Sequence, residues 1–186
     1  MMIVNLPQTY LIGLCLLLVI IAILVGRQLY KVRRDEMKLI KLEKVDSKTN
    51  EDSAKMYELA SVQLKKRLYP QATTTLKQAL KKLDGEPQEA KALIENALGF
   101  ALAAQNDFKS AVIHYKKALS AKSEYPVALN NLGFAYQRLL KEDEAYKNYQ
   151  EVLKLDPNNK TAISQIKRLE RIIGKDKDQL LNKKGF

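Results

Sequence analysis

The sequence contains little of the chemistry that most enzymes use. Among its 186 residues there is one histidine, His114, and one cysteine, Cys15. A transition-metal site needs more such ligands than these, and a single cysteine cannot form an intrachain disulfide. No glycine-rich phosphate loop and no serine nucleophile motif is present. We therefore expect a non-enzymatic protein that uses no metal and no cofactor, with His114 on a solvated helix face.

The N-terminal segment 1–26 also lacks every charged side chain. Folded as a helix, the stretch 6–26 is long enough to cross the roughly 30 Å hydrocarbon core of a bilayer. A cleaved secretory signal needs basic residues at its start, and residues 1–9 contain none. The pattern predicts an uncleaved N-terminal transmembrane anchor over residues 1–26, in contact with lipid through residues 6–26.

Basic residues follow the apolar run at once. Positive charge resists translocation, so we expect the N-terminus to cross the membrane and the rest of the chain to face the cytoplasm or stroma. We interpret 27–52 as a basic juxtamembrane helix and linker, with a hinge at 46–52 and helix-capping residues between Asn50 and Ser53. The side chains expected to contact anionic lipid headgroups are Arg27, Lys31, Arg33 and Arg34.

The charge of the whole chain is strongly positive, with 32 basic residues against 21 acidic ones. Such an excess suits an anionic membrane surface, an acidic partner or nucleic acid, and it suits equally well a solvated surface. No recognised nucleic-acid motif accompanies the charge, so we expect no nucleic-acid partner.

Internal repetition carries the most information about the fold. The segment LIENALGFALAAQNDFKSAVIHYKKAL, residues 93–119, is matched at a constant offset by VALNNLGFAYQRLLKEDEAYKNYQEVL, residues 127–153. A weaker copy begins near Ser53, with Ala60 in place of the repeated glycine. The identical pairs are Leu98 and Leu132, Gly99 and Gly133, Phe100 and Phe134, Ala101 and Ala135, Ala111 and Ala145, Tyr115 and Tyr149, and Leu119 and Leu153.

These segments resemble the tetratricopeptide repeat, in which two antiparallel helices occupy about 34 residues. In that family small residues stand where the helices pack most closely. The resemblance predicts an all-α fold: an N-terminal transmembrane helix, then an α-solenoid of three helix pairs and a C-terminal capping helix. We expect extra residues near 86–91 to lengthen one connection, and Gly174 to stop the capping helix before a disordered basic tail, 174–186. The predicted domain is 53–173, with repeats at about 53–86, 92–125 and 126–159 and the capping helix at 160–173.

Such a solenoid has a concave groove, formed by the first helix of each pair, that can hold a peptide or a helix. Asparagine there can pair with a peptide backbone, phenylalanine can anchor an apolar side chain, and arginine can meet a carboxylate. Alternatively, Phe100 and Phe134 cover the seam between repeats. The predicted partner-binding residues are Asn96, Phe100, Asn130, Asn131, Phe134, Gln137 and Arg138, with Tyr57, Ser61, Lys65 and Ala103 completing the expected lining.

The layout as a whole resembles the small membrane-anchored tetratricopeptide proteins of cyanobacteria and plastids that act in photosystem I assembly. The resemblance rests on the uncharged anchor, the basic flank RQLYKVRRDE and the repeats ending in LKLDPNN. It implies a thylakoid location, photosystem I subunits or assembly intermediates as partners, and a role as an assembly or stability factor. The alternatives are a general membrane-anchored adaptor in quality control, secretion or membrane-protein insertion, and a lipid or nucleic-acid tether that uses the basic segments.

Overall fold

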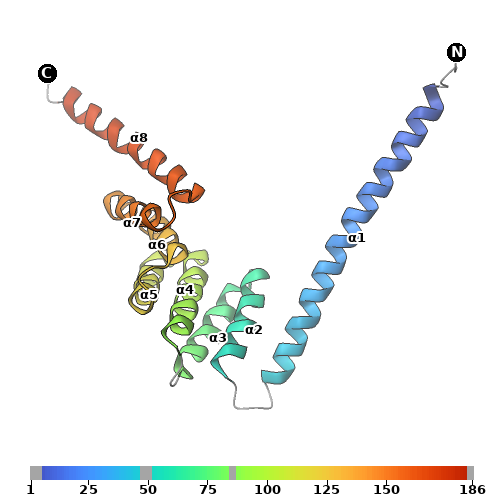
Figure 1. Ribbon diagram of the computed structural model, residues 1–186, viewed down its shortest axis with the longest axis horizontal. Helices are drawn as coiled ribbons and strands as arrows, with labels where there is room; N and C mark the ends of the chain where they lie inside the picture. Colours follow the sequence, from blue (N-terminus) through green and yellow to red (C-terminus); the bar gives the residue numbers. More distant parts are fainter. Residues whose placement is uncertain (1–5, 47–51, 84–86, 184–186) are drawn as a thin grey trace. The chain divides into compact units, whose positions relative to one another are not determined.

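The computed structural model describes residues 6–46, 52–83 and 87–183, and every regular element in those ranges is a helix (Figure 1). The all-α prediction is therefore confirmed. The chain divides into two units, Met1–Thr49 and Asn50–Phe186, and we describe each by itself. Most of the predicted hinge falls on residues 47–51, which lie outside the described residues.

The described part of the first unit is one helix, α1 (Leu6–Asp46), drawn in Figure 1 as a single unbroken rod. At 1.5 Å per residue its 41 residues extend for about 60 Å, roughly twice the thickness of a bilayer core. The segment Tyr10–Arg34 is long and apolar enough to cross a membrane, and none of it is buried by protein. The helix runs past Gly26 without a break, so the residues from Arg27 to Asp46 are helical, as the interpretation of a juxtamembrane helix requires.

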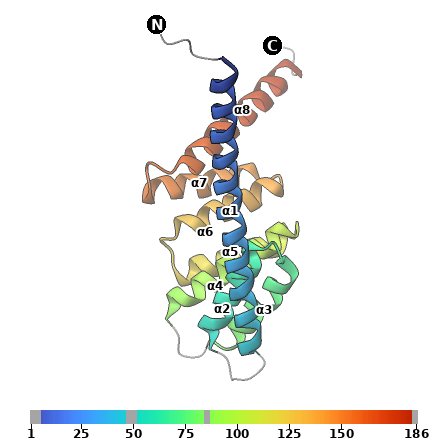
Figure 2. The same cartoon turned by 90° about the vertical axis from the view of Figure 1, so that its right-hand side faces the viewer.

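The second unit is a stack of helix pairs (Figures 1 and 2). Each helix packs against the one before it and the one after it, from the first pair to the last helix. Asp52 caps the first helix of this stack as predicted, since its carboxylate accepts a hydrogen bond from the backbone N–H of Ala54 at 3.4 Å. The elements are α2 (Ser53–Lys65) with α3 (Tyr69–Lys81), α4 (Gln88–Ala104) with α5 (Phe108–Ala121), α6 (Pro126–Arg138) with α7 (Glu142–Leu155), and then α8 (Lys160–Lys183).

The repeated glycines let the two helices of a pair approach closely. A Cβ built on Gly99 would lie 2.7 Å from the ring of Tyr115, and one on Gly133 would lie 2.9 Å from the ring of Tyr149. Both tyrosines are only 1% exposed. Burial raises the pKa of the Tyr149 hydroxyl to about 12, so the hydroxyl stays protonated and donates to Gln137 Oε1 at 3.1 Å. Glycine and tyrosine thus form a matched packing pair in each of these repeats.

The turn inside each pair has one recurring geometry. Arg67, Asn106 and Leu140 occupy equivalent positions, and each has a left-handed backbone with φ between 59° and 65°. The backbone N–H of the residue that follows bonds back to a carbonyl in the last helical turn, as Lys141 does to Tyr136 at 2.9 Å. This is the usual way in which a helix ends on a left-handed residue. Asparagine adopts the conformation readily, whereas leucine adopts it at a cost.

The core runs through the stack as two clusters joined by a shared residue. One cluster lies mainly between α2, α3 and α4 and includes Leu76 and Leu98; the other lies between α5, α6, α7 and α8 and includes Tyr149 and Leu169. Leu102 on α4 packs against both clusters. The last helix therefore covers the end of the core, as the capping-helix prediction requires.

One prediction about element boundaries holds in part and another is wrong. The connection 82–87 between α3 and α4 is longer than the connection 122–125 between α5 and α6, as expected. Residues 88–91, however, form the first turn of α4, where the Pro87 carbonyl accepts hydrogen bonds from Ala90 and Lys91. Glu89 stands in that turn, where the helix dipole favours an acidic side chain. Gly174 does not stop α8, which continues to Lys183. A single glycine costs a helix only about 1 kcal/mol relative to alanine, and no proline follows it. The predicted tail is thus helical over 174–183, and residues 184–186 lie outside the described residues.

Candidate functional site

The first helices of the pairs, α2, α4 and α6, lie next to one another and form one face of the stack. On α4 and α6 this face carries large apolar side chains that remain exposed at equivalent repeat positions. Leu93 and Val127 form one such row, and Phe100 and Phe134 form another, with 45% and 47% of the two phenylalanines exposed. An exposed apolar set at repeat spacing marks this face as a candidate interaction surface.

A cavity of about 300 Å³ opens on this face between α4, α5 and α6. The ring of Phe134 meets that of Phe108 edge to face, with centroids 6.2 Å apart, and the Arg138 guanidinium lies 5.0 Å from the Phe108 centroid. The cavity combines an aromatic wall with a cation at its side. Its lining consists of Phe100, Ala103, Ala104, Asn106, Phe108, Tyr115, Asn131, Phe134 and Arg138.

A short chain of hydrogen bonds runs beside the cavity. Asn131 donates to Asn96 Oδ1 at 3.0 Å, and Asn96 donates to the Tyr125 hydroxyl at 3.3 Å. Burial raises the pKa of Tyr125, nearby Tyr57 raises it further, and the hydrogen bond from Asn96 opposes both effects. The bonds hold the two asparagine side chains in fixed orientations across neighbouring repeats.

The structure brings four of the predicted groove residues to one cavity, namely Phe100, Asn131, Phe134 and Arg138, with Asn96 bonded to their edge. The other two predicted residues, Asn130 and Gln137, do not line the cavity. Asn130 is half-buried and donates to Asn159 at 3.3 Å, at the start of α8. Gln137 is 8% exposed, accepts from Tyr149 and donates to Gln165 at 3.2 Å.

The two interpretations of the phenylalanines prove compatible. Phe134 does cover a seam, because it packs on Phe108 from the preceding repeat, yet nearly half of its surface remains exposed. Phe108 itself was not among the predicted residues. Its equivalent in the third repeat is Glu142, whereas the first repeat has Tyr69 at that position. The signal that could have identified Phe108 is an aromatic residue at the first position of the second helix of a pair.

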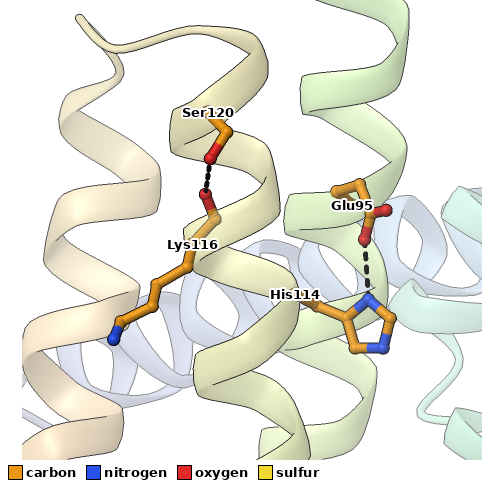
Figure 3. Close-up of polar contacts among 4 residues, drawn as sticks. All are labelled: Glu95, His114, Lys116 and Ser120. Atoms are coloured by element: carbon orange, nitrogen blue, oxygen red, sulfur yellow. Dashed lines mark hydrogen bonds and ion pairs between the residues drawn. The ribbon is translucent and has the colours of Figure 1, made fainter.

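The single histidine is not on a solvated face, and that prediction is wrong. Figure 3 shows His114 on α5 pointing across the pair toward Glu95 on α4, and the His114 Nδ1 to Glu95 Oε2 distance is 2.6 Å. The Glu95 side chain is only 5% exposed and that of His114 only 17%. A buried carboxylate needs a polar partner, and the sequence around His114 does not reveal that Glu95 lies opposite. No group of three metal-ligating side chains occurs among the residues that the structure describes.

Comparison with protein families matches the repeats directly. The model of the tetratricopeptide repeat matches residues 126–159, and a second tetratricopeptide-repeat model matches residues 99–139. The glycine and tyrosine pairs described above lie in the matched region.

Two relatives extend the likeness beyond the repeats. The protein named ycf37 of Guillardia theta is 30% identical over 173 residues, which cover 92% of this chain and 97% of that protein. A protein of Arabidopsis thaliana, the tetratricopeptide repeat domain-containing protein PYG7, chloroplastic, is 30% identical over 158 residues. That match covers 85% of this chain, which spans about half (52%) of the Arabidopsis protein.

Solved structures resemble the helical stack at lower sequence identity. The first tetratricopeptide domain of Spaghetti (RPAP3), bound to an HSP90 peptide, superposes with a TM-score of 0.61 at 21% identity over 66% of this chain and 96% of that one. The crystal structure of MamA superposes with a TM-score of 0.67 at 20% identity over 73% and 77% of the two chains. At these identities the likeness establishes the fold alone.

Proposed function

The chain belongs to the ycf37 family of tetratricopeptide-repeat proteins, and we propose that it is a membrane-anchored scaffold that assists the assembly of photosystem I. One observation carries the proposal: the match to the Guillardia protein covers 92% of this chain and 97% of that one. Such a match must include much of α1 as well as the repeats, so the two proteins share an architecture and not only a repeat. The chloroplastic name of the Arabidopsis relative supports a photosynthetic setting.

The length and apolar composition of α1 support the membrane part of the proposal. The exposed apolar surface of Tyr10–Arg34 is unfavourable in water, and a bilayer removes it from water. The basic residues from Arg27 to Arg34 then hold the following residues on the cytoplasmic or stromal side. The stack in this arrangement meets newly made subunits on the side of the membrane where they are synthesised.

The proposed partner-binding face carries the exposed phenylalanines, Asn96, Asn131 and Arg138. Tetratricopeptide stacks present rigid concave surfaces, so binding requires little ordering of the scaffold itself. The neighbour bound to an HSP90 peptide shows that a stack of this size can hold a peptide. We assign no catalytic step to this face, which offers hydrogen bonds, apolar contact and one cation.

The test is to cross-link the tagged full-length chain in its native membranes, solubilise it gently and identify what co-purifies. We expect photosystem I subunits or partly built complexes. A matched pair of variants locates the contact: Phe134→Ser alters the candidate face, and Ile113→Ser alters an equally exposed position on α5 (54% against 47%). Phe134→Ser should lose the subunits and Ile113→Ser should retain them.

A different set of proteins in the same experiment would contradict the proposal. Reproducible recovery of secretion, insertion or proteolysis components without photosystem subunits indicates a general membrane adaptor. Binding to membranes or nucleic acid that falls steeply with salt and is unchanged by Phe134→Ser indicates a tether that acts through the basic segments.

A further inference from the structure

We propose that the cavity between α4, α5 and α6 is a socket for one apolar side chain of the partner, and that Arg138 pairs with an aspartate or glutamate next to that side chain. The partner segment is therefore an extended peptide with adjoining apolar and acidic residues. The proposal rests on the scaffold function, but it names chemistry that the scaffold function alone does not specify.

The size and walls of the cavity carry the first half of the argument. Its volume of about 300 Å³ lies at the bottom of the range of roughly 300–1,000 Å³ that is typical of small-molecule sites. Such a space admits one large side chain together with part of the backbone that carries it, and it is too small for a whole helix. Phe108 braces Phe134 edge to face, so the wall exists before the partner arrives. The exposed part of Phe100 completes it from the neighbouring repeat.

The charge of Arg138 carries the second half of the argument. Arg138 lies over the Phe108 ring, and no carboxylate among the described residues lies within ion-pair distance of it. The ring contact restrains the guanidinium beside the socket, which lowers the entropy lost when it binds. An arginine held in this way takes a carboxylate through charge-assisted hydrogen bonds. The acidic group must lie close to the inserted side chain, because Arg138 lines the same cavity.

Asn131 supplies a contact for the peptide backbone. Its bond to Asn96 uses one of its amide hydrogens and fixes its orientation. Its other hydrogen and its oxygen can then donate to and accept from a peptide unit, which requires an extended chain because the backbone of a helix is already paired. The socket and its neighbouring side chains thus recognise an apolar side chain, a backbone unit and a carboxylate within one short segment of the partner.

The probe is a library of random peptides displayed inside a phage coat protein, selected on the full-length chain in lipid nanodiscs. We expect the enriched peptides to share an apolar residue adjoining an aspartate or glutamate. Synthetic copies with an amidated C-terminus should bind the wild-type chain. Arg138→Glu should weaken that binding at least tenfold, and Arg138→Gln should weaken it less.

Charge exchange gives the sharpest control. A peptide with lysine in place of its acidic residue should bind the Arg138→Glu chain more tightly than it binds wild type. Lys147→Glu, an equal change of charge at an exposed position on α7, should leave every affinity within about twofold. Circular dichroism should show the same helix content in all variants.

Three outcomes overturn the socket. The first is enrichment of peptides without an acidic preference, and the second is equally tight binding of the enriched peptides to Arg138→Glu and wild type. The third is a requirement for a free C-terminal carboxylate, because the assigned group is an acidic side chain. If the socket fails while photosystem I subunits still co-purify, the scaffold function stands and its contact lies elsewhere. If the socket is found but no photosystem subunit co-purifies, the assigned client is wrong.

Discussion

The close contact of Gly133 with Tyr149 predicts how the third repeat responds to one added methyl group. A Cβ at this position lies 2.9 Å from two ring atoms, nearer than such atoms approach in practice. The ring cannot move toward solvent, because it is 1% exposed and its hydroxyl is bonded to Gln137. Gly133→Ala gains about 1 kcal/mol in helix propensity. Overpacking costs about 1–3 kcal/mol, so we expect a net loss of about 1 kcal/mol.

In the first repeat the positions equivalent to Gly133 and Tyr149 are occupied by Ala60 and Leu76, and both are fully buried. Tyr149→Leu alone should cost about 2–3 kcal/mol through a cavity and a lost hydrogen bond. In the double variant the added methyl group has room, so Gly133→Ala should then be neutral or stabilising. The expected coupling is about 1–2 kcal/mol.

The assay is urea unfolding of the full-length chain in detergent micelles, followed by far-ultraviolet circular dichroism. Ala60→Gly serves as the control in the reverse direction and should destabilise the chain, since no ring occupies the space beside it. Strict additivity of Gly133→Ala and Tyr149→Leu would refute the packing account. A stabilising Gly133→Ala in the wild-type background would refute it as well.

Three further predictions follow from single side chains. Leu140→Asn should stabilise the domain by about 1 kcal/mol, because leucine holds a left-handed backbone with φ of 59° while 85% exposed, and a thermal melt measures this. His114→Ala should cost about 2 kcal/mol or more in urea unfolding, because it leaves buried Glu95 unpaired, whereas Glu95→Gln should cost less. Asp107 caps α5, and its hydrogen bonds to Ser110 lower the pKa of its carboxyl. The ionised carboxylate therefore stabilises the fold above the unfolded-state pKa, and this stabilisation is lost as pH falls through the lowered value. Asp107→Asn should remove that part of the acid dependence of stability, which thermal melts across the acidic range would show.

The fold was predictable because its strongest determinants repeat. The constant offset between the repeats makes Gly133 equivalent to Gly99 and Tyr149 equivalent to Tyr115. The resemblance to the tetratricopeptide repeat predicts small residues at the closest helix contact, and the observed geometry of Gly133 and Tyr149 agrees with that prediction. Boundaries were less predictable, because one local signal does not determine where a helix ends. Gly174 carries a helix-stop signal, yet α8 continues because glycine ends a helix only when its backbone leaves the helical region.

The site was predictable only as far as the repeat extends. Phe100, Asn131, Phe134 and Arg138 follow from their positions on the first helices, and the structure places them at one cavity. Phe108 has no counterpart in the third repeat, where Glu142 occupies its position, and only Tyr69 in the weaker first repeat is aromatic there. The partners of Gln137 and His114 lie across helices, at separations that a one-dimensional pattern does not encode.

The most direct test of the central claim is the amount of photosystem I in cells that lack this chain. The proposed function predicts that photosystem I falls while photosystem II is retained, and that the full-length chain restores it. Pulse labelling should show that newly made photosystem I subunits are synthesised at the normal rate but fail to enter the complex. Normal photosystem I accumulation in cells without the chain, under several light conditions, would contradict the account.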